Sequence, residues 1–125
     1  MYLTERMVLK KGWQGATHDS RFAMCGVFHG ETRMPAHRVV SYVEGKSAAD
    51  SPVGSATFRG HEFHYSDVVL DKKTRYAYVL SRGIGILDNL DGALTNSTLG
   101  SYTHLHPVAS RGMIRHFVDQ CRKKT

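Results

Sequence analysis

Two histidines near the end of the chain alternate with a hydroxyl and an apolar residue in the stretch 101–107, Ser-Tyr-Thr-His-Leu-His-Pro. Because side chains of an extended strand alternate between its faces, His104 and His106 are predicted to point the same way, away from Thr103 and Leu105. The proline that follows would end such a strand, and a helix is expected after it. Two imidazoles at a strand-to-helix turn are suited to proton transfer, and a purely structural role is the alternative.

A second polar stretch, Gly-His-Glu-Phe-His-Tyr-Ser, occupies residues 60–66. Strand alternation places Glu62, His64 and Ser66 on one face and His61, Phe63 and Tyr65 on the other. A zinc or iron site built from His61, His64 and the two later histidines, with Glu62, is one interpretation. The alternation disfavours it, because it separates His61 from His64.

Two glycine motifs lie between these stretches. The sequence Gly-Ile-Gly-Ile at 83–86 has some features of a phosphate-binding loop, but it lacks the third glycine and a following helix, so this signal is weak. Asp91-Gly92 is a typical hairpin turn sequence and predicts a turn between residues 86–87 and residues 93–94.

The elements that would position these residues follow from hydrophobic periodicity. Residues 2–9 fit a short helix, and the apolar run 22–28 fits a buried strand. Further strands are expected at residues 38–44 (ended by Gly45), 56–66 and 75–80. A closing amphipathic helix carries an apolar stripe formed by Met113, Ile114, Phe117, Val118 and Cys121. The pattern predicts an α/β fold with a mixed sheet and flanking helices.

Composition bounds the class of protein. A chain of 125 residues with 41% hydrophobic residues and 12 glycines is a single globular domain at most. It contains no apolar run long enough to cross a membrane and no signal peptide pattern, and its two distant cysteines suit free thiols in the cytoplasm. The net charge of +6 comes from small clusters without interleaved aromatics, which argues against nucleic acid as a partner and leaves an anionic small molecule open.

The order of the motifs resembles the C-terminal part of cobyrinic acid a,c-diamide synthases, in the cobalamin-type branch of class I glutamine amidotransferases. The most specific match is the stretch 60–66, followed by the stretch 101–106. The resemblance implies a cysteine thiolate that attacks the side-chain amide of glutamine, a histidine that moves protons, and release of ammonia. It also implies a separate N-terminal synthetase domain that uses ATP and Mg²⁺ to activate carboxylates of cobyrinate, which the ammonia amidates.

The family nucleophile lies in the pattern Cys-Gly-Gly-x-Met-Tyr-Leu, and residues 1–3 match its last three positions. Residues 1–125 are therefore expected to be a partial amidotransferase domain without the nucleophile elbow and the synthetase domain, inactive alone and without a cofactor or metal of its own. The resemblance places Cys25 at an apolar strand position, and both Cys25 and Cys121 are expected to be core thiols.

The resemblance carries roles over to individual residues. His104 matches the catalytic histidine. His106 stands where many class I amidotransferases have an acidic residue, so either the site works without that carboxylate or Glu62 supplies a partner across the sheet. The residues Glu62, His64, Tyr65 and Ser66 would line the glutamine pocket or the interface with the synthetase domain, and a buried polar network is the alternative.

Two other functions stay open at this point. Nickel-sirohydrochlorin a,c-diamide synthase, of coenzyme F430 biosynthesis, shares these motifs and would act on a different tetrapyrrole. A stand-alone accessory module that binds a partner or a tetrapyrrole without catalysis is the non-enzymatic alternative. Glutamine and a tetrapyrrole are the expected small-molecule partners, no membrane partner is expected, and a homodimer remains open.

Overall fold

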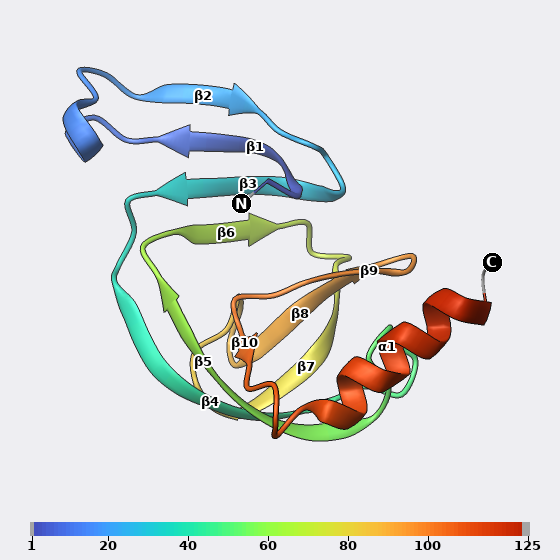
Figure 1. The fold of residues 1–125 in the computed structure, drawn as a ribbon. Coiled ribbons are helices and arrows are strands. Elements are labelled where there is room, and N and C mark those ends of the chain that lie inside the picture. Colours follow the sequence, from blue (N-terminus) through green and yellow to red (C-terminus); the bar gives the residue numbers. More distant parts are fainter. Residues whose placement is uncertain (1, 124–125) are drawn as a thin grey trace. The chain divides into compact units, whose positions relative to one another are not determined.

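The computed structural model describes residues 2–123, which form two compact units. Residues 2–39 and 63–74 make up unit 1, and residues 40–62 and 75–123 make up unit 2. Each unit contains one sheet, and Figure 1 labels the strands of both. No helix among the described residues is long and apolar enough to span a bilayer.

The sheet of unit 1 has four strands in the order β2-β1-β3-β6. Its strands are β1 (Thr4–Leu9), β2 (Ser20–Ala23), β3 (Phe28–Met34) and β6 (Asp67–Leu70), and a 3₁₀ turn (Trp13–Gly15) joins β1 to β2. The two central strands β1 and β3 are parallel, whereas β2 and β6 pair antiparallel at the edges. The sheet is therefore mixed, as the sequence predicted.

The second sheet has six strands in the order β10-β5-β4-β7-β8-β9. Its strands are β4 (Val39–Ser47), β5 (Ala56–His64), β7 (Arg75–Arg82), β8 (Leu90–Thr95), β9 (Thr98–Gly100) and β10 (His104–Leu105). Strands β4 and β5 bend strongly along their length (Figure 1). The short strand β10 pairs antiparallel with β5, so the histidine stretch 101–107 joins the stretch 60–66 at the edge of this sheet.

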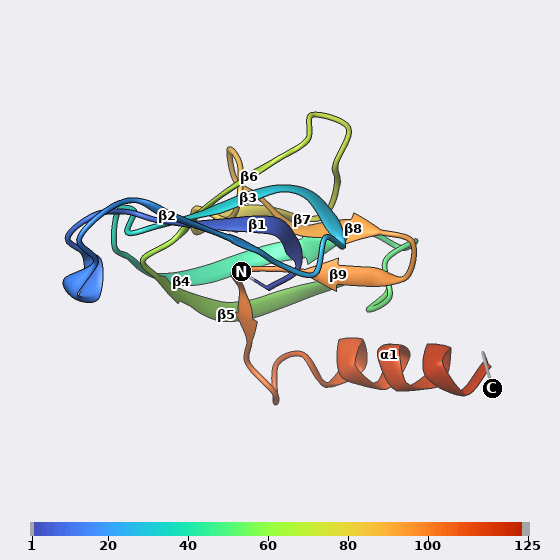
Figure 2. The same ribbon diagram turned by 90° about the horizontal axis from the view of Figure 1, so that it is seen from above.

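A single α-helix, α1 (Arg111–Lys123), closes the described part of the chain. The chain leaves β10 and enters α1 through a short connection (Figure 2). Met113 packs into the core of unit 2, which consists of Val43, Phe58, Ala77, Tyr78, Leu80 and Met113. Within this core, the rings of Phe58 and Tyr78 pack against each other, with their centroids 4.7 Å apart. The mixed α/β architecture and the closing helix are confirmed.

Two predictions for the first 30 residues are wrong. Residues 4–9 form strand β1 instead of a helix, with Thr4 and Val8 buried. Residues four apart share a face in a strand as well as in a helix, so the spacing did not separate the two, and both residues are β-branched. The run 22–28 is not one buried strand: β2 ends at Ala23, Gly26 adopts φ 69°, and β3 begins at Phe28.

The prediction that Gly45 ends a strand is also wrong, because β4 continues to Ser47. A Cβ at position 45 would lie 2.8 Å from the Phe58 ring and 2.9 Å from Leu80, so the glycine serves close packing. Likewise, Asp91 and Gly92 lie inside β8 and do not form a turn. The chain reverses earlier, at Asp88 and Asn89, which both have positive φ.

The apolar stripe of the last helix is exposed over most of its length. Met113 is buried, but Ile114, Phe117 and Val118 are exposed by 46%, 47% and 42%. Both cysteines are free and exposed, so the expectation of core thiols is wrong for Cys25 and for Cys121. For Cys25 the reason is the turn at Gly26, which takes it out of the strands; Cys121 lies on α1 beyond the residue that enters the core.

Candidate functional site

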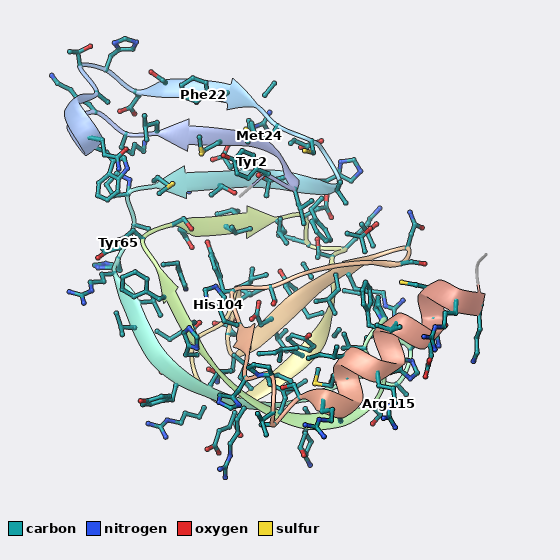
Figure 3. The ribbon with its side chains drawn as sticks, viewed as in Figure 1. Tyr2, Phe22, Met24, Tyr65, His104 and Arg115 are labelled. Carbon is teal, nitrogen blue, oxygen red and sulfur yellow. The ribbon has the colours of Figure 1, made fainter. Side chains whose placement is uncertain are left out.

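His104 lies on β10 at the edge of the sheet of unit 2 (Figure 3). Its side chain is exposed, whereas Thr103 before it is buried, so the alternation predicted for this stretch is confirmed at these two residues. His104 is the direct cross-strand partner of His61 on β5. The Nδ1 of His104 lies 3.2 Å from the Nε2 of His61, and the two rings meet edge to face at 85°.

Gly60 explains how β10 comes this close to β5. It pairs with Leu105, and a Cβ at position 60 would collide with the carbonyl oxygen of His104. Any side chain there would push β10 away from β5. The glycine that opens the motif 60–66 is thus needed to seat His104 on the neighbouring strand.

Asp91 fixes the backbone immediately before His104. This carboxylate is fully buried and accepts hydrogen bonds from the N–H groups of Tyr102 and Thr103, at 3.1 and 2.9 Å. It also accepts a hydrogen bond from the hydroxyl group of Thr103, at 2.6 Å. A carboxylate that satisfies two backbone donors and a hydroxyl holds its loop firmly, because breaking any of these bonds would leave a buried polar group unpaired.

The negative charge of Asp91 also acts on two tyrosines of β7. Burial, with a smaller contribution from Asp91, raises the pKa of Tyr78 to about 12. The same two causes raise the pKa of Tyr76. Both phenols therefore stay protonated at neutral pH.

His106 contributes to the turn into α1. Its side chain is exposed, and its Nδ1 lies 3.4 Å from the N–H of Ala109, a weak contact at best. Its backbone donates to the carbonyl of Arg59 and accepts from the N–H of Ser110, which anchors the start of the helix. The hydrogen-bond contact of His104 is made with His61, a residue that the sequence did not single out as its partner.

Glu62 is fully buried, on the face of β5 opposite to His61. Its Oε1 accepts the N–H of Ile84 at 2.6 Å and its Oε2 accepts the N–H of Gly85 at 3.1 Å. The glycine loop 83–86 thus holds a carboxylate of the same chain instead of a phosphate, and the phosphate-loop interpretation has no support. Both carboxylate oxygens serve the backbone, which favours the buried-network interpretation of Glu62.

The remaining residues of the predicted pocket belong to unit 1. His64 Nδ1 bonds to the carbonyl oxygen of Ser66 at 2.9 Å, and Ser66 is buried. The ring of Tyr65 packs edge to face on Phe63, with centroids 5.5 Å apart, and lies 5.9 Å from Trp13. The shared face of Phe63 and Tyr65 agrees with the alternation, and a common pocket of these residues with Glu62 stays a prediction.

Within residues 2–123, no group of three or more histidine, cysteine, aspartate or glutamate side chains is arranged to hold a metal ion. The exposed pair His61 and His104 is the histidine cluster that unit 2 presents at its sheet edge. A neutral imidazole carries one donor and one acceptor nitrogen, so this pair can hold and pass a proton.

Comparison with known proteins gives this geometry a context. A profile of the CobB/CobQ-like glutamine amidotransferase domain matches residues 1–111. The chain is similar to the cobyrinate a,c-diamide synthases of Methanosarcina barkeri (39% identity over 130 residues) and Methanosarcina acetivorans (38% over 131 residues). It is also similar to that of Syntrophotalea carbinolica, at 34% identity over 128 residues. Each match covers 98% of this chain and 26% of the relative, so the chain spans about a quarter of these proteins.

Proposed function

Because this chain belongs to the CobB/CobQ-like glutamine amidotransferase domains, we propose that it supplies the proton-transferring histidine of a glutamine-hydrolysing site. The observation that carries the proposal is the setting of His104: exposed, in contact with a second imidazole, and attached to a loop that a buried carboxylate fixes. Because the ring is exposed, a thiol or a substrate amide can reach its nitrogens, which burial in the core would prevent.

The chemistry that this setting supports is amide hydrolysis through a thioester. The Nε2 of His104 takes the proton of a cysteine thiol, and the thiolate attacks the side-chain amide carbon of glutamine. The histidine then gives the proton to the leaving nitrogen, which departs as ammonia. The Nε2 of His104 next takes a proton from water, and the resulting hydroxide hydrolyses the thioester to glutamate. The histidine returns that proton to the departing thiolate, which regenerates the thiol. His104 is the catalytic residue in this scheme, and His106 supports it by anchoring the turn into α1.

The nucleophile in this proposal comes from a segment outside the 125 residues, with the family pattern Cys-Gly-Gly-x-Met-Tyr-Leu. Cys121 lies beyond the matched residues 1–111, on α1. Cys25 lies between β2 and β3, and its backbone N–H donates to the carbonyl of Tyr2. Because its thiol is exposed, Cys25 is the competing nucleophile that an experiment must address directly.

The reaction of the whole protein is proposed from its relatives. We propose that the ammonia amidates the a and c carboxylates of cobyrinate, in a cytoplasmic ligase whose ATP and Mg²⁺ bind in a separate synthetase domain, with glutamine and the tetrapyrrole as substrates. The name of the relatives supports this choice. Amidation of nickel-sirohydrochlorin is the second candidate, because it uses the same glutamine chemistry on another tetrapyrrole.

A chimaeric enzyme tests the proposal. This chain would replace the matching segment of the Methanosarcina barkeri enzyme, and the chimaera would be supplied with cobyrinate, ATP and either glutamine or ammonia. We expect His104→Ala to lower glutamine-dependent amidation about 100-fold or more, because general acid–base catalysis contributes roughly that much. Amidation with free ammonia should be unchanged, which also shows that the chimaera is folded.

Two results would overturn the proposal. Retention of glutamine-dependent activity in His104→Ala would show that another group moves the proton. Glutamine hydrolysis by the 125-residue chain alone, abolished by Cys25→Ala, would show that the nucleophile lies inside this sequence. We expect no ammonia release from glutamine by the chain alone.

A further inference from the structure

The partner of His104 is an imidazole on the adjacent strand, not a carboxylate. His104 and His61 face each other directly across the β10–β5 pair, both side chains exposed. Because neither ring is buried, core packing does not explain their contact. The Nδ1 of His104 and the Nε2 of His61 are 3.2 Å apart, a distance at which one ring donates a hydrogen bond to the other.

From this geometry we propose that His61 is a positioning residue that holds His104 in the tautomer with Nδ1 protonated. The Nδ1–H of His104 donates to the Nε2 lone pair of His61, and the lone pair on the Nε2 of His104 is left free. His61 then carries its own proton on Nδ1. This inference rests on the proposed function for its catalytic meaning, because only a free Nε2 on His104 can accept a thiol proton.

The arrangement performs the orienting role that an acidic residue has in other histidine-based sites. When His104 takes up a proton on Nε2, its Nδ1–H keeps donating to the neutral His61, so the contact persists through both protonation states. No proton leaves His61 in this scheme. A neutral acceptor stabilises the imidazolium less than a carboxylate does, but with its own proton on Nδ1 it accepts the same hydrogen bond.

The surrounding residues fix the backbone that carries the pair. Gly60 lets the strands approach, since a Cβ there would collide with the carbonyl oxygen of His104. Asp91 holds the two peptide groups before His104. The ring of His106, which lies just after β10, has its hydrogen-bond contact with the N–H of Ala109 and not with His104.

The test is a tautomer measurement on the 125-residue chain itself, by NMR of ¹⁵N-labelled imidazoles with the histidines neutral. In the wild type we expect the Nδ1 of His104 to give the signal of a protonated nitrogen and its Nε2 that of an unprotonated one. In His61→Phe, which keeps a flat ring but removes the acceptor, we expect loss of this pattern and a return to the Nε2–H form that free histidine prefers.

Two further variants complete the design. His61→Gln should restore the Nδ1–H form of His104, since its amide oxygen can accept the same proton. His37→Phe, which removes an exposed histidine of unit 1, should leave the His104 signals unchanged. The amide signals of residues 104 and 105 report whether β10 still pairs with β5. The inference would be overturned if His104 of the wild type were the Nε2–H tautomer. It would also be overturned if His61→Phe left the tautomer of His104 unchanged while β10 still paired with β5.

The chimaera separates this inference from the proposed function. There, His61→Phe should lower kcat for glutamine about tenfold with little change in KM, and ammonia-dependent amidation should be unaffected. If the tautomer result holds while His104→Ala keeps full glutamine use, the proposed function fails and the pair remains. If His104→Ala abolishes glutamine use while the tautomer result fails, only the role of His61 is overturned.

Discussion

Two buried carboxylates in unit 2, Glu62 and Asp91, do the same structural task in different ways. Each is fully buried and accepts the N–H groups of two consecutive residues, 84–85 for Glu62 and 102–103 for Asp91. The loop held by Glu62 needs glycines with left-handed backbone: Gly83 has φ 112° and Gly85 has φ 72°. The loop held by Asp91 contains no glycine, and the hydroxyl of Thr103 adds a third hydrogen bond instead.

The difference shows which of the two carboxylates acts on the candidate site, and that it does so through the backbone. The glycine loop at Glu62 curls around an anion of its own chain, as such loops curl around phosphates, because successive N–H groups converge on one point. The loop at Asp91 leads directly into His104, so the hydrogen bonds that fix this loop also fix the backbone that carries the imidazole. Glu62 is next to His61 in the sequence, but it does not fix the loop that enters the candidate site. Asp91 fixes that loop.

The strongest way to break the Glu62 loop is Gly85→Ala. The residue has φ 72°, and a Cβ would lie 2.6 Å from the carbonyl oxygen of Leu90, which accepts the N–H of Ile86. Strain and collision together should lower the free energy of unfolding by about 2–4 kcal/mol. Urea denaturation measures this directly.

Gly112→Ala is the matched control for that substitution. Gly112 lies in α1, has ordinary helical backbone, and has nothing within 4 Å of the position that an added Cβ would occupy. The change should leave stability unchanged or raise it by up to about 1 kcal/mol. Equal losses for both variants would mean that the loop geometry described for residues 83–86 is wrong.

The second prediction compares the two carboxylates themselves. Asp91→Asn and Glu62→Gln keep the side-chain shape but turn one acceptor into a donor that faces a backbone N–H. Each should lower the free energy of unfolding by about 1–3 kcal/mol, because a buried hydrogen bond becomes a donor–donor contact.

The signature of each substitution should be local. In ¹H–¹⁵N spectra, Asp91→Asn should shift the amides of Tyr102 and Thr103 most and carry over to His104, whereas Glu62→Gln should shift Ile84 and Gly85 most. Equal shifts at His104 in both variants would contradict the separate roles given to the two carboxylates.

Short-range pattern in the sequence predicted much of unit 2 but not how its motifs are used. Alternation correctly placed Glu62 opposite His61, and periodicity predicted the last helix. The pair Asp91-Gly92 has the composition of a turn, yet it lies inside β8, where the aspartate reaches residues 102–103. Such a contact between distant residues leaves no trace in local composition, which is why it could not be predicted.

The candidate site shows the same division. His104 could be singled out because a histidine stretch and a family resemblance both point to it. Its contact with His61 depends on the register of β10 against β5, and a slip of one residue would have placed another side chain there. A Cβ at position 60 would collide with the carbonyl oxygen of His104, a three-dimensional constraint that the sequence shows merely as one glycine.

The smallest expected effect is the contribution of Asp91 to the pKa of Tyr78. The pKa of Tyr78 is raised to about 12, first by burial and then by the charge of Asp91. Asp91→Asn should therefore lower the pKa of Tyr78 only part of the way towards 10, and Glu62→Gln should leave it unchanged. The difference in phenolate absorbance between each variant and the same variant carrying Tyr78→Phe isolates this titration.

The sign of the effect on stability follows from the direction of the shift. Because the folded protein holds Tyr78 protonated more strongly than the unfolded chain does, this stabilisation is complete below pH 10 and is lost as the pH rises from 10 to about 12. Tyr78→Phe, which cannot ionise, should move alkaline unfolding to higher pH. Alkaline unfolding at the same pH in both proteins would show that the phenol of Tyr78 is not enclosed as described, and the charge of Asp91 would then have no buried phenol to act on.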